Sequence, residues 1–449
     1  MADQSQVIAG QQDDVCDVDQ LIDKTPISWR QMMVILLCAL LCMADGFDVQ
    51  AMAYAAPQIA RDWNLAPSAL APAFSAGIFG GLIGGFFICP LADRIGPKRV
   101  LIISVLIFGP LTLATAFVTS TTAITILRGL SSIGMGSLLA PVIAYMVATA
   151  PRRMRSVAIV LTGCFITLGA ILGGVVSSFM IVRFGWQSIF ILGGVTPLVV
   201  LAVAAFVLHE PLSYLLLSRQ PESRVRAALE ALGKGRFIAG VRRFTFQQPP
   251  QQQRAGLAGM VETRLLGTVV LYVATFIAAN FYFIIASWLP LTLSQAGFSV
   301  QTAVLGGVVL SSGGLIGCIL SSFMMNRLGV YTVMAGGYGL AAALMLVPAA
   351  GASGGLLFVL IFLIGLTGFG AHFCLPVLMT SFYPRQFHNT AVGFSMGFAR
   401  MGGAIAPFIG AWALQQGGAG MLYLVAAVGA IVPAALIWAT GQRWSTTFQ

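Results

Sequence analysis

The stretch PLADRIGPKRV at residues 90–100 recurs in altered form as FMMNRLGVYTV at residues 323–333. Each copy follows the second long apolar run in a set of six. A second pair of echoes lies two runs later in each set, APRRMRSVA at 150–158 and YPRQFHNTAVG at 383–393. Repeats of this kind are typical of membrane transporters built from two related halves, with the substrate site between the halves near the bilayer midplane. The sequence therefore predicts two similar halves.

The composition places both halves in a membrane. Of the 449 residues, 58% are hydrophobic and only 8% are charged, a ratio that soluble domains do not reach. A bilayer core about 30 Å thick takes roughly 20 apolar residues per helix, and lipid offers backbone groups no water to bond. We therefore predict an all-α integral membrane protein with twelve transmembrane helices in two pseudo-symmetric six-helix bundles. The predicted spans are 32–56, 68–90, 100–119, 123–149, 156–181, 187–208, 266–289, 302–325, 331–350, 353–379, 389–414 and 419–440.

One long hydrophilic segment, residues 209–264, separates the halves at 30–208 and 265–440. Within it, Val225, Leu229 and Leu232 recur at helical spacing, which predicts a short amphipathic helix followed by a flexible Gln/Pro segment. Residues 1–29 and 441–449 are predicted to be cytosolic tails. The N-terminal tail is acidic, shows no cleaved signal peptide, and is expected to be disordered.

The 24 lysines and arginines sort by loop and form no single basic patch, which argues against a nucleic-acid partner. Most lie on the side that carries the termini, so the positive-inside rule predicts a multi-pass protein of the cytoplasmic (inner) membrane with both termini in the cytosol. No pair of the seven cysteines has metal-ligand spacing, and no Ser/His/Asp set is evident. We therefore expect no metal, no cofactor and no enzyme activity.

Two carboxylates stand inside the first span. Of the 14 acidic residues, only Asp45 and Asp48 fall within a predicted membrane helix, where a charged aspartate costs about 2.5–3.5 kcal/mol. A spacing of three places both on one helix face. Burial and mutual repulsion favour the protonated form of such a pair, which predicts proton binding near neutral pH. The alternative is hydrogen bonding between helices.

Two arginines in other spans carry the opposite charge to these acids. Arg128 in span four lies at a depth similar to that of Asp48, so we expect it to pair with the deprotonated aspartates; a purely structural arginine is the alternative. Arg400 in span eleven sits among small residues and is predicted to bind a substrate carboxylate. His372 in span ten is either a site residue or a packing histidine.

At the loop after span two, the sequence resembles the major facilitator superfamily through Asp93, Arg94, Gly96, Lys98 and Arg99. The resemblance implies that the acid and its basic neighbours, with gating residues Asp93, Arg94, Gly96 and Arg99, hold the cytosolic side shut. An ordinary loop salt bridge is the alternative reading of Asp93. The chain departs from the signature at Cys89, where glycine is usual, at Pro97, and at Asn326 in the second copy.

Within that superfamily, the chain resembles the aromatic acid:proton symporters. DGFDVQAMAYAAPQIA at 45–60, Arg128, and YPRQFHNTAVGFSMGFARMGG at 383–403 carry this likeness, with His388 where arginine is usual. It implies a proton-coupled importer of a small aromatic carboxylate that serves catabolism of aromatic compounds, with Asp45, Asp48, Arg128 and Arg400 in the site. We expect a monomer in the lipid bilayer whose partners are the acid and protons.

A flat aromatic acid requires aromatic walls, and several spans offer them. The candidates are Phe47, Tyr54, Phe74, Phe165, Asn280, Tyr282, Trp288, Phe369 and Phe398. Trp288 lies near the outer end of its span and is alternatively an interfacial anchor. Two other functions stay open at this stage, a proton-coupled exporter of organic acids or drugs on the same fold, and a receptor that binds ligand without carrying it.

Overall fold

The computed structural model describes residues 15–151, 154–238, 241, 243–245, 265–351, 354–384 and 387–444. Its membrane region is entirely helical, and eleven helices in the described part are long and apolar enough to cross a bilayer. The last of them, α18 (His388–Trp444), breaks at Gly417 and Gly418, whose backbone angles are non-helical, so it comprises two crossings. The all-α integral membrane fold is confirmed.

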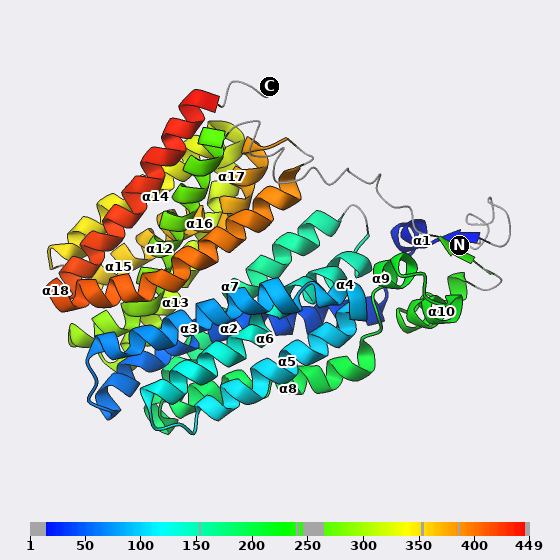
Figure 1. The fold of residues 1–449 in the computed structure, drawn as a ribbon, viewed down its shortest axis with the longest axis horizontal. Coiled ribbons are helices and arrows are strands. Elements are labelled where there is room, and N and C mark those ends of the chain that lie inside the picture. The colour runs from blue at the N-terminus through cyan, green and yellow to red at the C-terminus, as the bar shows by residue number, and fades with distance from the viewer. Residues whose placement is uncertain are drawn as a thin grey trace.

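Six crossings come from each half of the chain (Figure 1). The N-terminal half holds α2 (Trp29–Asp62), η1 (Pro67–Leu70), α3 (Ala71–Ile83), η2 (Gly84–Ile88), α4 (Leu91–Ile95), α5 (Pro97–Thr115), α6 (Thr121–Thr149), α7 (Arg155–Phe184) and α8 (Gln187–Val207). The C-terminal half holds α12 (Leu265–Gln295), α13 (Val300–Leu328), α14 (Val330–Ala349), α15 (Gly355–Ile364), η5 (Gly365–Phe369), α16 (Gly370–Phe373), α17 (Leu375–Phe382) and α18.

Corresponding helix pairs in the two halves meet at glycines. In the first half, a Cβ on Gly136 of α6 would lie 2.0 Å from the backbone oxygen of Gly81 in α3. In the second half, a Cβ on Gly317 of α13 would lie 1.9 Å from the backbone oxygen of Leu366 in η5. Such approaches exclude any side chain, and small residues are the usual means of close helix packing in lipid. The two halves, which repeat each other in sequence, thus also pack their corresponding helices in the same way.

The halves meet mainly through α7 with α13, α3 with α18, and α2 with α12, and α2 also contacts α13. Figure 1 shows the halves meeting at the end away from α9 (Leu212–Leu217) and α10 (Glu222–Ala231) and diverging toward those helices. At the closed end, Arg61 Nη2 donates to Ser294 Oγ at 2.8 Å. Nearby, a Cβ on Gly307 of α13 would lie 2.9 Å from the Tyr54 ring of α2. The halves therefore close on one side of the membrane.

The N-terminal segment folds onto the linker at the open end (Figure 1). The strand β1 (Val15–Asp17) pairs in parallel with β2 (Arg243–Thr245), with Val15 opposite Arg243. The helix α1 (Val18–Lys24) buries Val18, Leu21 and Ile22 in a cluster with α9 and α10. The short turn η4 (Gly235–Phe237) follows α10.

The expectation of a disordered tail is therefore wrong for residues 15–24. Val18, Leu21 and Ile22 stand at helical spacing, a signal that predicts an apolar helix face even in an acidic segment. An ion pair of 2.5 Å between Arg155 and Asp19 anchors the segment to α7. In the linker, α10 buries Val225 and Leu229, the residues with amphipathic spacing. Residues 1–14 and the Gln/Pro segment at 246–264 lie outside the described residues.

Candidate functional site

A cavity of about 200 Å³ lies between the halves. The N-terminal half contributes walls from α2, α3 and α6, and the C-terminal half contributes α12 and α18. The lining residues are Asp45, Val49, Gln50, Met52, Ala73, Phe74, Gly77, Ile78, Gly81, Arg128, Ser132, Met135, Gly136, Leu139, Phe283, Ser287 and Arg400. One carboxylate and two guanidinium groups thus share an otherwise mostly apolar chamber, the usual form of a small-molecule site.

An ion pair joins α2 to α6 at the cavity wall. Arg128 Nη1 lies 2.6 Å from Asp48 Oδ1, and Arg128 Nη2 donates to the Asp48 backbone oxygen at 3.1 Å. Asp48 is fully buried and Arg128 is 3% exposed. Thr112 Oγ1 on α5 lies 3.5 Å from Asp48 Oδ1. The depth match between spans one and four therefore corresponds to a direct contact, made by Asp48 and not by Asp45.

The helix starts fix the depth of this pair. Ser28 and Gln31 form a capping box at the start of α2, in which each side chain bonds the other residue's backbone N–H. Ser120 caps α6 by accepting a hydrogen bond from the Ala123 N–H. Because both helices begin at defined residues, Asp48 and Arg128 reach the same level from opposite ends of the bundle.

The other two charged groups of the cavity come from opposite halves. Asp45 on α2 and Arg400 on α18 both line the chamber. Arg400 Nη1 donates to the backbone oxygen of Gly81 on α3 at 2.5 Å. Asp45 and Asp48 thus differ in surroundings, since one faces the cavity and the other is bound to Arg128.

Several predicted substrate contacts lie outside this chamber, among them Phe47, Asn280 and Tyr282. A Cβ on Gly173 of α7 would overlap the Phe47 ring, which packs there instead. Asn280 donates to the Phe276 backbone oxygen at 3.0 Å. Tyr282 stacks on His372 with ring centroids 4.4 Å apart and planes 8° apart. Substrate contact by these residues stays a prediction for other states of the transporter.

Tyr54 and Trp288 belong to the protein core. The Tyr54 hydroxyl donates to the Ala170 backbone oxygen at 3.0 Å. Trp288 has no exposed surface and packs on the cavity residue Phe74, with ring centroids 5.3 Å apart. The reading of Trp288 as an interfacial anchor is wrong, because such an anchor must reach the lipid surface. Its effect on the cavity is indirect, through Phe74.

Among the lining residues that sequence reasoning missed are three polar side chains and one aromatic ring, Gln50, Ser132, Ser287 and Phe283. Ser132 stands four residues after Arg128 on the same helix, a spacing that puts both on one face. Gln50 is a polar residue inside the first span, so a search for uncharged polar groups near Asp48 finds it. Phe283 and Ser287 carry no comparable signal, because aromatic and small hydroxyl residues recur throughout the spans.

The predicted gating loop is built around Gly96, between α4 and α5. Its φ of +100° favours glycine, and a Cβ there would lie 2.5 Å from Glu210 Oε1. Glu210 accepts a hydrogen bond from the Lys98 backbone N–H at 3.1 Å, which caps the start of α5. Burial raises the pKa of the Glu210 carboxyl above its ordinary value, although Lys98 and Arg99 oppose the shift.

Asp93, Arg94 and Arg99 are exposed in this conformation. No ion pair to Asp93 occurs within the described ranges, and Tyr214 donates to the Arg94 backbone oxygen at 3.2 Å. At the start of α18, His388 Nε2 lies 2.8 Å from the Tyr383 backbone oxygen. The cytosolic latch stays a prediction for a state in which the halves close at this end.

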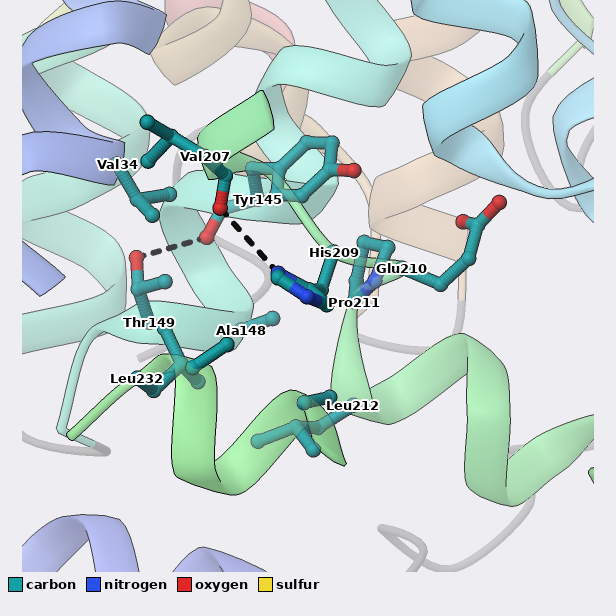
Figure 2. A pocket seen from close by; sticks show the side chains of 12 residues that line it. Val34, Tyr145, Ala148, Thr149, Val207, His209, Glu210, Pro211, Leu212 and Leu232 are labelled. Carbon is teal, nitrogen blue, oxygen red and sulfur yellow. Dashed lines mark hydrogen bonds between the residues drawn. The ribbon is translucent and has the colours of Figure 1, made fainter. Parts of the chain in front are cut away.

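A second cavity, of about 20 Å³, lies beside the gating loop and is lined by Val34, Tyr145, Thr149, His209 and Glu210 among others (Figure 2). Figure 2 shows His209 turned toward the Val207 backbone oxygen, 3.3 Å from its Nδ1. A volume of this size holds about one water molecule, so this space is too small for an organic substrate. Within the described residues, no three His, Cys, Asp or Glu side chains gather as metal ligands.

Comparisons with known proteins agree with this architecture. The family model of the Major Facilitator Superfamily matches residues 36–383. The gallate transporter of Pseudomonas putida is 32% identical over 429 residues, which cover 95% of each chain. The 4-hydroxybenzoate transporter PcaK of Acinetobacter baylyi is 32% identical over 401 residues, which cover 88% of this chain and 87% of that one.

Solved structures show the same fold at low identity. The E. coli xylose transporter XylE, in a partially occluded inward-open conformation, has a TM-score of 0.70 at 15% identity, with 92% of this chain and 98% of that chain covered. A bacterial homologue of the human lysosomal transporter Spinster has a TM-score of 0.71 at 13% identity, with 93% and 98% covered. These structures support the arrangement of the helices, and the substrate question rests on the residues of the cavity.

Proposed function

This chain belongs to the major facilitator superfamily, and we propose that it imports a small aromatic carboxylate together with protons across the cytoplasmic membrane. It is a membrane transporter, not an enzyme, related to aromatic acid:proton symporters. The observation that carries the substrate proposal is the cavity between the halves, where Arg128 and Arg400 supply cations and Asp45 supplies a carboxylate. Relatives named for gallate and 4-hydroxybenzoate support an aromatic acid.

We derive a transport cycle from the charged side chains in and beside the cavity. A buried guanidinium retains its proton at all relevant pH values, so Arg400 is a permanent anion site. A carboxylate can lose its charge, so protonation of Asp45 removes its competition with the substrate for Arg400. Protonation of Asp48 likewise releases Arg128. Substrate and protons then bind together, the halves rock, and both leave on the other side.

The closed end of the interface supports the direction of that movement. Arg61 and Ser294 join the halves there, while Asp93 at the opposite end is exposed. With the positive-inside rule placing the linker and both termini in the cytosol, this conformation faces inward. We propose that the protein works as a monomer, since each chain carries both halves and the whole cavity.

The number of protons decides whether membrane potential drives uptake. One proton with one monoanion moves no net charge. A second proton adds about 2.3 kcal/mol per 100 mV of potential, and the two acids, Asp45 and Asp48, permit either ratio. Uptake measured at a fixed pH gradient, with and without an imposed potassium diffusion potential, separates the two ratios.

Vesicles of opposite orientation test import against export. Right-side-out vesicles with an acidic exterior are expected to accumulate radiolabelled 4-hydroxybenzoate, because protons and the acid move inward together. Exchange of the acid for protons in the opposite direction would instead establish the exporter, which the same fold permits. Binding without flux in proteoliposomes would establish a receptor and overturn both transport readings.

A further inference from the structure

Two thiols lie side by side in the C-terminal half, away from the central cavity. Cys318 Sγ on α13 is 3.9 Å from Cys374 Sγ, which stands where α16 ends and α17 begins. Cys374 is 2% exposed, whereas Cys318 is partly exposed. Both cysteines are free thiols, and the transport cycle proposed above uses neither of them. The pair therefore needs an account of its own.

A close approach of two helices brings the thiols together. A Cβ on Gly370 of α16 would lie 2.6 Å from the backbone carbon of Gly317 and 3.0 Å from the backbone nitrogen of Cys318. Only glycine permits this contact, which sets the two backbones against each other. Cys374 follows Gly370 by one helical turn and so lies on the same side of its helix.

The span that contains Cys374 is discontinuous at this thiol. It is made of α15, η5, α16 and α17, and η5 is a π-helical segment of the kind frequently found at functional sites. The helix is interrupted again at Cys374, whose backbone angles, φ −90° and ψ 2°, are not those of an α-helix. Pro376 follows at the start of α17 and has no backbone N–H to restore the ladder. The span can therefore bend at Cys374.

The thiol pair stands between two mechanical parts of the transporter. On one side, α17 packs against α18, and Tyr383 just after α17 donates to Thr268 Oγ1 on α12 at 3.0 Å. On the other side, α13 packs against α7 of the N-terminal half. A covalent bond between Cys318 and Cys374 would fix the bend to the helix that contacts the other half, so α17 could no longer move independently of α13.

Oxidation to a disulfide requires a two-electron oxidant, such as hydrogen peroxide or diamide. With peroxide, the more exposed Cys318 sulfur attacks one oxygen and forms a sulfenic acid and water. The Cys374 sulfur then displaces the hydroxyl group as a second water and forms the S–S bond. Two thiols and one peroxide thus give one disulfide and two waters. The sulfurs must approach by about 1.9 Å to reach the bond length of about 2.05 Å, which rotation of two short side chains can supply.

We propose that Cys318 and Cys374 form an oxidation site, at which a two-electron oxidant joins the thiols as a disulfide that holds the bend at Cys374 and stops transport. A partly exposed thiol beside a buried resolving thiol is the usual arrangement of a redox-sensing pair. Thiol–disulfide exchange with a dithiol reverses the modification. The effect on transport of an aromatic acid rests on the proposed function, whereas formation of the disulfide does not.

Peptide mass spectrometry of the full-length protein in proteoliposomes maps the disulfide. After treatment with hydrogen peroxide and blocking of the remaining thiols with N-ethylmaleimide, the wild type is expected to yield peptides linked through Cys318 and Cys374. Dithiothreitol is expected to separate them. Cys318→Ala and Cys374→Ala are each expected to lose the link. Cys164→Ala is the matched control, because Cys164 is also a partly exposed cysteine within a span, and it is expected to keep the link.

Two further readouts test the hold on the span. Exchange of labelled for unlabelled 4-hydroxybenzoate requires the halves to alternate, and its rate is expected to fall in proportion to the fraction of chains that carry the disulfide. Dithiothreitol is expected to restore the rate, and Cys318→Ala to keep it after peroxide treatment. Amide hydrogen exchange of residues 365–382 needs no substrate and is expected to slow in the oxidised wild type, because the disulfide restricts local opening.

The outcomes separate the oxidation site from the proposed function. Absence of the linked peptides would overturn the site. Linked peptides with unchanged acid exchange and unchanged amide exchange would overturn the hold, and so would inhibition that persists in Cys318→Ala. A wild type that exchanges no acid before oxidation would overturn the proposed function, while the peptide map and the amide exchange would still confirm or overturn the site.

Discussion

The buried pair of Asp48 and Arg128 predicts an asymmetric response to losing either charge. Asp48→Asn leaves the Arg128 guanidinium buried without its anion, and removing one partner of such a pair costs about 3–5 kcal/mol. Arg128→Met leaves Asp48 unpaired, but an aspartate can escape by taking up a proton, whereas an arginine cannot lose one. The loss from Arg128→Met is therefore expected to be smaller than the loss from Asp48→Asn and to shrink as the pH is lowered.

The variant that combines Asp48→Asn and Arg128→Met gives the more decisive unfolding free energy. With both charges gone, no unpaired ion remains, so the double variant is expected to be more stable than Asp48→Asn alone by about 2 kcal/mol or more. Unfolding in mixed detergent micelles, followed by tryptophan fluorescence, measures each free energy. Arg183→Met is the control, since Arg183 is exposed near the end of α7 and its loss is expected to cost about 0.5 kcal/mol. A double variant whose loss equals the sum of the two single losses would refute the pairing.

Three further predictions concern packing, substrate charge and the gating loop. Gly136→Ala places a methyl group 2.0 Å from the Gly81 oxygen and is expected to cost about 3 kcal/mol or more, whereas Gly163→Ala meets nothing within 4 Å and is expected to be neutral or stabilising in the same unfolding assay. Arg400→Lys loses the two-pronged grip on a carboxylate and is expected to weaken binding of 4-hydroxybenzoate about tenfold by calorimetry; unchanged affinity would exclude Arg400 as the anion site. Because burial raises the pKa of Glu210, its contribution to stability is present in acid and lost as the pH rises above 4.5 through the raised value. Glu210→Gln is therefore expected to gain stability relative to wild type as pH rises, and parallel pH profiles of melting temperature would show that the prediction is wrong.

The spans and charged residues could be predicted because membranes make both conspicuous. Long apolar runs are rare in soluble proteins, and each acid within a span stands out against lipid-compatible neighbours. Asp48 and Arg128 were paired from helix depth alone, and the structure joins them at 2.6 Å. The sequence did not show which of the two aspartates makes the contact, because a spacing of three places both on the same face.

The aromatic and polar walls were harder to predict. Phenylalanine, tyrosine and tryptophan make up 10% of the chain, so an aromatic residue in a span says little about which cavity it faces. Tyr54 and Trp288 are buried between helices, while Phe283 lines the cavity without any distinguishing pattern. Gly77 lines the cavity as one of 51 glycines, and only the packed structure shows which of them do so.

Gradient-driven accumulation of 4-hydroxybenzoate in proteoliposomes tests the coupling of acid transport to protons most directly. With an imposed pH gradient, acidic outside, the wild type is expected to concentrate the acid and to lose the accumulated pool when a protonophore is added. Asp45→Asn is expected to keep exchange of labelled for unlabelled acid but to accumulate none against its gradient. Accumulation by Asp45→Asn and by Asp48→Asn equal to that of wild type would contradict the assignment of proton coupling to these carboxylates.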